Sequence, residues 1–243
     1  MLRAVLFDLD DTLLGNPMER FLPVYFDALG QHLADLVPPE RLIRELMRAT
    51  EAMNANLDPA STNEKVFASV FYPAVPCDRE TLKAAFEAFY VEEFPKLRGV
   101  TERRDAARSL VSSALERGLK VVVATNPLFP RIAVEERLAW AGVPVAEFDY
   151  ALVTTYETMH TTKSSLLYYR EILQRLEVLP REALMVGDDW DLDVIPASSI
   201  GLHVYWTSQH KGFLASVPEL VGSGTLSELW ALVEARSWAL LVD

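Results

Sequence analysis

The first strongly apolar stretch of the chain lies near its beginning. Val5, Leu6 and Phe7 follow one another with no polar residue between them. A strand with one face in water alternates apolar and polar residues, whereas a strand covered on both faces reads as a continuous apolar run. The stretch therefore predicts an inner strand of a parallel sheet.

Strand and helix patterns alternate again in the second part of the chain. Short apolar runs predict further strands at 119–124, 150–153, 183–186 and 202–206. Apolar residues at helical spacing predict helices at 101–117, 131–141, 164–176 and 226–239. Such an order of elements is typical of an α/β fold in which right-handed crossovers build a parallel sheet.

The segment between the first strand and this alternating part reads almost wholly as helices. Phe21, Tyr25, Leu29 and Leu33 recur at the spacing of one helix face. Two more helices are predicted at 63–71 and 81–94. We expect an all-helical cap domain at 15–97, inserted into a core made of 1–14 and 98–243. The position of the insertion predicts that it overhangs the carboxyl end of the first strand.

Composition and charge narrow the class of protein. The formal net charge is −12, and a chain without a basic patch is not expected to bind nucleic acid or an anionic membrane. Cys77 is the one cysteine, which excludes an internal disulfide and favours a reducing compartment. No apolar run reaches the ~18 residues of a membrane span. We expect a cytoplasmic protein whose partner is a small molecule.

Two carboxylates directly follow the first strand. Asp8 and Asp10 lie two residues apart, so in an extended chain they point to the same side. At ~4 Å and an effective dielectric near 20, two such charges repel by about 4 kcal/mol. A fold tolerates this where a cation lies between them or one carboxyl keeps its proton. The alternative is that Asp11 and Thr12 cap a turn and the acids are solvated.

Polar residues also follow the other predicted strands. They are Thr125 and Asn126, then Lys163, then Asp188, Asp189 and Asp193. Each taken singly has an ordinary structural explanation, such as a helix cap or a solvated side chain. In an open α/β sheet, however, ligands bind at the carboxyl ends of the strands. We therefore expect these side chains to gather with Asp8 and Asp10 at one edge.

These residue types together suit the transfer of a phosphoryl group. A carboxylate can attack phosphorus and form an acyl phosphate, and a cation such as Mg²⁺ is needed to bring the carboxylate and the phosphate dianion together. A lysine, a threonine hydroxyl and backbone N–H groups can bind the phosphate oxygens. A second carboxyl can protonate the leaving oxygen and later accept a proton from water.

The four motifs, in this order, resemble those of the haloacid dehalogenase-like hydrolase superfamily. They are Asp8-Leu9-Asp10-Asp11-Thr12, the strand ending in Thr125-Asn126, Lys163, and the segment from Gly187 to Asp193. The resemblance implies a Rossmann-like parallel sheet, a helical cap, bound Mg²⁺ and an aspartyl-phosphate intermediate. Lys163 is followed by Ser164 where the family commonly has proline.

The same resemblance implies a role for each matching residue. Asp8 is expected to be the nucleophile and a metal ligand, and Asp10 the general acid and base with a backbone oxygen on the metal. Thr125, Asn126 and Lys163 are expected to bind the phosphate. Asp188 is expected to be the second carboxylate ligand of the metal. Either Asp189 or Asp193 is expected to support the water shell of the metal.

The sequence leaves several functions open. The favoured one is a Mg²⁺-dependent phosphatase that hydrolyses a small phosphorylated metabolite. A phosphomutase would use the same residues, and the dehalogenases resemble the chain least because they lack the acid at Asp10. From other classes, a phosphorylation-controlled receiver-like module and a catalytically inactive scaffold remain as alternatives. The substrate and the oligomeric state are not predicted.

Overall fold

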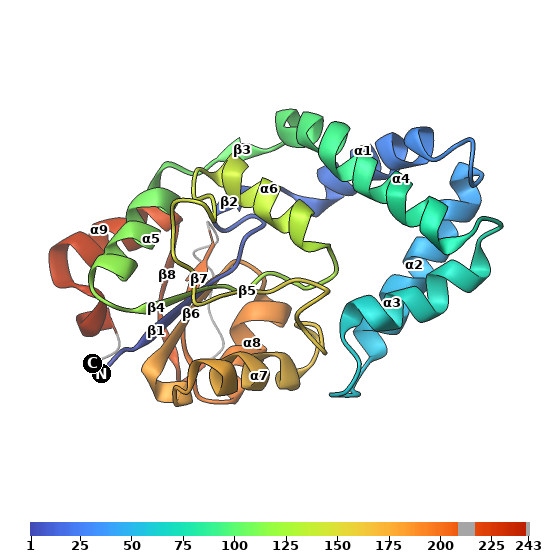
Figure 1. The fold of residues 1–243 in the computed structure, drawn as a ribbon. Helices are drawn as coiled ribbons and strands as arrows, with labels where there is room; N and C mark the ends of the chain where they lie inside the picture. The colour runs from blue at the N-terminus through green and yellow to red at the C-terminus, as the bar shows by residue number, and fades with distance from the viewer. Residues whose placement is uncertain (209–216, 242–243) are drawn as a thin grey trace.

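In this computed structural model, residues 1–208 and 217–241 are described, and they contain a six-stranded parallel sheet (Figure 1). The order across the sheet is β5-β4-β1-β6-β7-β8. The strands are β1 (Ala4–Phe7), β4 (Lys120–Val123), β5 (Leu152–Val153), β6 (Ala183–Gly187), β7 (His203–Thr207) and β8 (Leu220–Gly224). The α/β class predicted from the alternation of elements is confirmed.

The first strand lies in the middle of the sheet. β1 pairs in parallel with β4 on one side and with β6 on the other. Val5, Leu6 and Phe7 are all fully buried. Val5 and Phe7 belong to the hydrophobic cluster on one face of the sheet, and Leu6 belongs to the cluster on the other. The inner strand predicted from the apolar run is therefore present.

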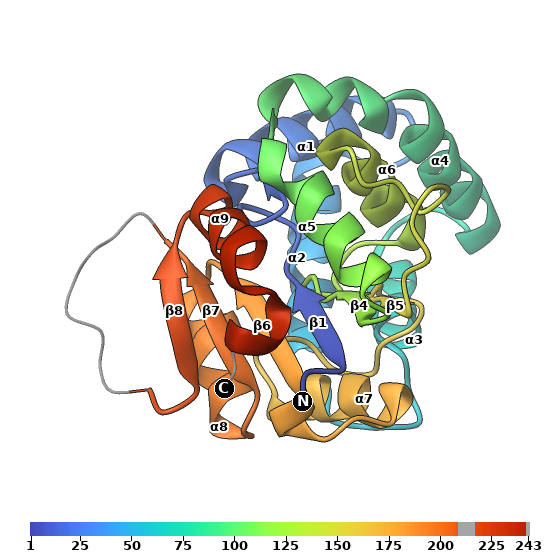
Figure 2. The ribbon, with the colours of Figure 1, turned by 90° about the vertical axis from the view of Figure 1, so that its left-hand side faces the viewer.

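Helices cover both faces of this sheet (Figure 2). On the face of Val5 and Phe7 lie α5 (Asp105–Glu116), α6 (Arg131–Ala141) and α9 (Leu226–Arg236). On the face of Leu6 lie α7 (Leu166–Leu176) and α8 (Ile195–Ser199). Apolar side chains thus fill two layers, which leaves the edge at the carboxyl ends of the strands for polar residues.

A helical insertion separates β1 from β4, as predicted, and Figure 1 shows it as a group of helices beside the sheet. It contains α1 (Met18–His32), α2 (Pro39–Ala55), α3 (Asn63–Phe71), α4 (Arg79–Glu92) and two 3₁₀ turns, η1 (Tyr72–Ala74) and η2 (Phe94–Val100). Phe94 stacks on Trp140 of α6, with ring centroids 5.3 Å apart. Aromatic packing therefore joins one end of the insertion to the core.

The other side of the insertion is also docked on the core. The backbone N–H groups of Asn63 and Glu64 donate to the carbonyls of Met159 and Tyr156, each at 2.8 Å. The side-chain amide of Asn63 is fully buried and donates to the Pro127 carbonyl at 3.2 Å. The insertion therefore contacts the core at two places, through Phe94 and through Asn63 and Glu64.

Three short strands were not predicted from the sequence. A helix was expected from residue 101, but β2 (Leu14–Gly15) pairs antiparallel with β3 (Glu102–Arg103), and α5 begins only at Asp105. This ribbon joins the two chain segments that enter and leave the insertion, so residues 102–103 stay extended. β8 was not predicted, because two of its five residues are glycine. Among the described helices, none has the length and apolar character needed to cross a membrane.

Candidate active site

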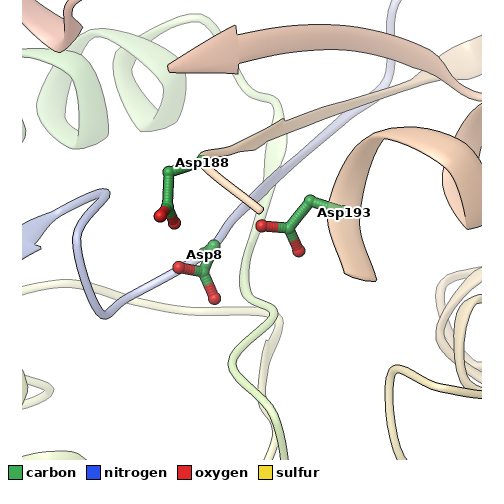
Figure 3. Close-up of side chains that lie close together, drawn as sticks. All are labelled: Asp8, Asp188 and Asp193. Carbon is green, nitrogen blue, oxygen red and sulfur yellow. The ribbon is translucent and has the colours of Figure 1, made fainter. Parts of the chain in front are cut away.

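Three carboxylates meet at the carboxyl edge of the sheet (Figure 3). Asp8 follows β1, Asp188 follows β6, and Asp193 lies in the π-helical turn Trp190–Val194. One carboxylate oxygen of each residue lies within 4.8 Å of the others. The three segments are far apart in the sequence, and the parallel sheet brings them together because β1 and β6 are neighbours.

Lys163 lies among these acids. Its ammonium group forms ion pairs with the carboxylates of Asp8 and Asp193, the second at 2.7 Å. The lysine side chain is 3% exposed, and the residue stands in the loop between β5 and α7. The structure therefore places Lys163 beside the acids that follow β1 and β6, although serine follows the lysine in place of proline. The cluster therefore contains three acidic side chains and one lysine.

Close approach of Asp193 to the end of β6 depends on a glycine. A Cβ atom added at Gly187 would lie 2.3 Å from the Oδ2 atom of Asp193. The backbone N–H of Asp189 donates to the same Oδ2 at 3.2 Å, and the hydroxyl of Tyr169 donates to Oδ1 at 3.3 Å. The absence of a side chain at Gly187 thus gives the Asp193 carboxylate its place beside Lys163.

Burial makes ionisation of this cluster costly. Removal from water raises the pKa of Asp8 well above its usual range, against the lowering effect of Lys163. Burial, together with the charge of Asp193, raises the pKa of Asp188 from 3.8 to about 7. Burial also raises the pKa of Asp193. Burial opposes the charge of Lys163, but the carboxylates of Asp193 and Asp8 outweigh it and raise its pKa.

These donors fit a hard divalent cation. Mg²⁺ prefers carboxylate oxygens and water, and it is usually held by one or two carboxylates. Asp8, Asp188 and Asp193 offer such oxygens in one small volume, and a cation there would favour their ionised forms against the burial and the mutual repulsion that raise their pKa values. The chemistry of the site therefore matches the expected Mg²⁺.

The structure separates the two acids that the sequence left as alternatives. Asp193 joins Asp8 and Asp188, whereas the carboxylate of Asp189 turns to its own helical turn. There Oδ1 of Asp189 accepts from the N–H groups of Asp191 and Leu192, at 2.9 and 3.0 Å. Asp189 thus caps the turn that carries Asp193.

Asp10 has its own set of partners beside the cluster. Its Oδ1 atom accepts from the side-chain amide of Asn16 at 2.7 Å, and its Oδ2 atom forms an ion pair with Arg137. Neither partner was predicted as a site residue. Asn16 lies between β2 and α1, and Arg137 lies 127 positions away from Asp10 in the chain.

The sequence of α6 contains a feature that points to Arg137, because this arginine falls among the apolar residues of one helix face. The buried face of α6 includes Ala133, Val134, Leu138 and Ala141, and Arg137 lies on that face with a fully buried side chain. Its guanidinium carbon lies 4.6 Å from the centre of the Phe129 ring. An arginine on the apolar face of a helix is rarely buried without a charged partner, and this one has Asp10.

The turn after β1 orients another polar group toward the cluster. Asp11 has a positive φ of 58°, a conformation that aspartate tolerates better than most residues. The Asp11 carboxylate accepts from the backbone N–H of Asn16 at 3.0 Å, which closes the turn. Thr12 then donates from its hydroxyl to Asp188 at 3.2 Å. The Asp11-Thr12 turn thus orients Asp188.

Two of the three predicted phosphate-binding residues lie just after β4. Thr125 is 2% exposed, and its carbonyl accepts from the hydroxyls of Thr154 and Tyr168 at 2.7 and 2.8 Å. Asn126 accepts from the backbone N–H of Lys163 at 3.2 Å. These bonds fix the strand end against the loop that carries the lysine.

All the candidate residues line one cavity of about 920 Å³ between the helical insertion and the sheet edge. They are Asp8, Asp10, Thr125, Asn126, Lys163, Asp188, Asp189 and Asp193. The structure thus brings together every site residue expected from the sequence, with a cavity above them that can hold a substrate.

Comparison with known proteins finds one relative by sequence and several similar folds. The chain is 27% identical over 214 residues to ribulose-1,5-bisphosphate 5-phosphatase from Halopiger xanaduensis, covering 83% of each sequence. Its fold is similar to that of a phosphatase from Thermococcus onnurineus, with a TM-score of 0.58 and 21% identity over 96% of this chain and 98% of that one. It is also similar to that of a 2-haloacid dehalogenase from Pseudomonas syringae pv. Tomato DC3000, with a TM-score of 0.65 and 22% identity over 97% and 99% of the two chains.

A family model covers most of the sequence. The model of the haloacid dehalogenase-like hydrolases matches residues 2–201. This range contains all four motifs and the complete helical insertion. The chain therefore belongs to the haloacid dehalogenase-like hydrolases and is an enzyme of the hydrolase class.

Proposed function

We propose that the protein is a Mg²⁺-dependent phosphatase that hydrolyses a small phosphate monoester through an aspartyl phosphate on Asp8. The observation that carries the proposal is the position of the Asp8 carboxylate. It lines the cavity, it is held by Lys163, and it shares a small volume with the carboxylates of Asp188 and Asp193. The sequence relationship to a bisphosphate phosphatase supports the same reaction class.

In the first half of the reaction an oxygen of Asp8 attacks phosphorus. The bond between that oxygen and phosphorus forms while the bond from phosphorus to the ester oxygen breaks. Lys163, already bonded to Asp8, holds a positive charge beside the phosphoryl oxygens. The hydroxyl of Thr125, at the cavity wall, can donate to another of these oxygens.

Asp10 acts as the general acid in the first half of the reaction and as the general base in the second. Its carboxyl group gives a proton to the departing ester oxygen, which leaves as an alcohol. Water then attacks phosphorus, a proton of the water passes to Asp10, the bond to Asp8 breaks, and inorganic phosphate is released. Arg137 and Asn16 determine where the Asp10 carboxyl points during these transfers.

Asp8 and Asp188 are the residues that would hold the Mg²⁺ ion, with a backbone oxygen of Asp10. Bound Mg²⁺ supplies positive charge that reduces the repulsion between the nucleophile and the phosphate dianion. Asp193 keeps Lys163 in place and orients the polar groups around the ion, since it contacts both the ammonium group and the Asp189 N–H.

We assign residues 15–97 to a cap that separates the site from bulk water and selects the substrate. The cavity walls on the insertion side come from α1, α2, α3 and α4, which supports this assignment. A phosphomutase would need the same residues and would pass the phosphoryl group to a second substrate instead of water. Steady release of inorganic phosphate distinguishes the two.

The test is phosphate release from p-nitrophenyl phosphate by the full chain. We expect steady turnover with Mg²⁺, loss of activity with EDTA, and recovery when Mg²⁺ is added in excess. Asp8→Asn removes the nucleophile and keeps the size of the side chain, so it should abolish turnover and retain the fold. Turnover that is indifferent to chelation, or that survives in Asp8→Asn, would contradict the proposal.

A further inference from the structure

The cavity is much larger than a phosphate group needs. Its volume of about 920 Å³ lies near the upper end of the ~300–1,000 Å³ typical of small-molecule sites. The catalytic carboxylates occupy only the end at the sheet edge. The remainder lies between the helices of the insertion and the loops that follow β4 and β5. The substrate therefore has room for a sizeable organic part.

Away from the carboxylates, the cavity walls are mainly aromatic and aliphatic. Wall residues of this kind are Leu22, Phe26, Met47, Phe67, Phe86 and Tyr156. Met47 is 45% exposed, and the others are partly buried, so each retains surface that a ligand can cover. Burial of apolar ligand surface against such walls is favourable, by about 25 cal/mol per Å².

The cations of this wall already have partners. Among the described residues, those lining the cavity beyond the catalytic end are Arg79, Lys83 and Arg131. Arg79 lies over the Tyr72 ring, with its guanidinium carbon 5.1 Å from the ring centre. Lys83 pairs with Glu87 at 3.9 Å, and Arg131 pairs with Glu135 at 3.2 Å.

The same wall contains more acids than bases. The glutamates that line it are Glu19, Glu64, Glu87, Glu135 and Glu157. Lys83 and Arg131 each neutralise one of them, Glu87 and Glu135, which leaves three glutamates against Arg79 among the described residues that line this wall. A second phosphate or a carboxylate on the substrate would therefore meet a net negative charge. Like charges placed together in this way are a means of excluding a ligand.

We infer that the substrate is a phosphate monoester whose organic part is predominantly apolar and carries no second anionic group. This inference rests on the proposed phosphatase function and specifies its substrate class. It separates this chain from its relative that acts on ribulose 1,5-bisphosphate, a substrate with two phosphates. Phe26 and Phe67 would contact the apolar part, while Lys163 and Thr125 hold the single phosphate.

The test compares substrates matched in leaving group. Cyclohexylmethyl phosphate and glucose 6-phosphate are both primary alkyl esters with a six-membered ring, and they differ in the polarity of that ring. We expect kcat/KM to be at least about tenfold higher for the cyclohexylmethyl ester, because a few buried methylene groups are worth that much. Ribulose 1,5-bisphosphate and fructose 1,6-bisphosphate should be poorer than both.

Variants of the apolar wall link this preference to the cavity. Phe67→Ala should reduce the ratio of the two kcat/KM values about tenfold, mainly through KM for the apolar ester. Met47→Ser tests the same wall at an exposed position where folding is not at risk, and should also reduce the ratio. Val91→Ala, at a 64% exposed position on α4 that does not line the cavity, is the matched control and should leave the ratio unchanged.

The outcomes separate the two proposals. A higher kcat/KM for either bisphosphate or for glucose 6-phosphate than for the apolar ester would overturn the inferred substrate class while the phosphatase function stands. The inferred class would also fail if the ratio were the same in both wall variants and in the wild type. If neither p-nitrophenyl phosphate nor any compound of the panel released phosphate, the proposed function itself would fail, and the inference with it.

Discussion

The fully buried guanidinium group of Arg137 forms an ion pair with the carboxylate of Asp10, whose side chain is 18% exposed. Arg137 reaches Asp10 from the apolar face of α6, and its Nε–H also donates to the Ala133 carbonyl at 3.2 Å within that helix. Asn16 holds the other oxygen of the same carboxylate. The direction of the proposed proton donor is therefore set from two sides, by residues outside the four motifs.

Replacement of Arg137 should reduce kcat most for esters with poor leaving groups. In Arg137→Ala the Asp10 carboxyl loses one of its two supports, and an alkyl phosphate depends on that carboxyl to protonate its leaving oxygen. General acid catalysis contributes about 10²–10⁴-fold. We expect kcat for an alkyl phosphate to fall about a hundredfold and kcat for p-nitrophenyl phosphate to fall far less, as measured by phosphate release.

The same variant should lose stability, because breaking a buried pair typically costs about 3–5 kcal/mol. Asp10 retains some exposure, so we expect the lower end of that range in urea denaturation. The exposed Arg170 on α7 gives the control, and Arg170→Ala should change neither quantity. Equal losses of kcat on both substrates in Arg137→Ala would show that the arginine does not act through Asp10.

Gly187→Ala should displace Asp193. The new methyl carbon would overlap Oδ2 of Asp193, and the carboxylate would have to move away from Lys163. A displacement of about 1 Å near reacting groups can reduce a rate about a hundredfold, and we expect a loss of kcat of that size. Gly99→Ala is the control, since its Cβ would meet no atom within 4 Å. If both variants retained full kcat, the position of Asp193 would be irrelevant to turnover.

The pKa of Asp188 predicts how pH affects metal binding. After removal of metal with EDTA, burial holds this pKa at about 7 against 3.8 in an unfolded chain. The folded state thus binds the proton more tightly, so this stabilising contribution is complete below pH 3.8 and is lost as pH rises through about 7. Mg²⁺ needs the ionised carboxylate and should restore stability over the same range.

We therefore expect Mg²⁺ to raise the melting temperature more at about pH 8 than at about pH 5.5, since binding to the ionised carboxylate stabilises the folded state. Thermal denaturation with and without Mg²⁺ measures the difference. In Asp188→Asn the dependence on pH should become smaller, and the part that remains comes from Asp8, whose pKa is also raised by burial. The same increase at both pH values in the wild type would be incompatible with Asp188 as a ligand.

Asp189 and Asp193 should respond differently to the same substitution. Asp189→Asn retains a side-chain oxygen that can cap the turn, so we expect a small loss of stability, within the ~1 kcal/mol typical of a cap, and nearly normal kcat. Asp193→Asn removes a charge bonded to Lys163 and should reduce kcat strongly. Assays of both variants at saturating Mg²⁺ decide between them, and a larger loss in Asp189→Asn would reverse the assignment.

Local patterns predicted the fold well where the end of an element has its own signal. The helices expected at 63–71 and 131–141 have these bounds in the structure. Thr62 caps the first, and Gly142, with a φ of +80°, ends the second. β2 and β3 were not predicted, because a strand of two residues has no pattern of its own. Each of them forms only by pairing with the other.

The part of the site that could be predicted from the sequence is the set of residues that directly follow strands. Asp8, Thr125 and Asp188 follow buried strands, so the parallel sheet alone places them at one edge. The pairing of Asp10 with Arg137 depends on how α6 packs, which no short stretch of sequence contains. The position of the Asp193 carboxylate beside Asp8 and Asp188 likewise depends on its close approach to Gly187.

The most direct test of the account is to identify the atom that carries the phosphoryl group during turnover. The Asp10→Asn variant, mixed with p-nitrophenyl phosphate and Mg²⁺ and quenched in acid, should accumulate the intermediate, because this leaving group departs without protonation and water then lacks its general base. Peptide mass spectrometry should find the mass of one phosphoryl group on Asp8. A phosphorylated residue other than Asp8, or turnover with no covalent phosphate on the protein, would contradict the account.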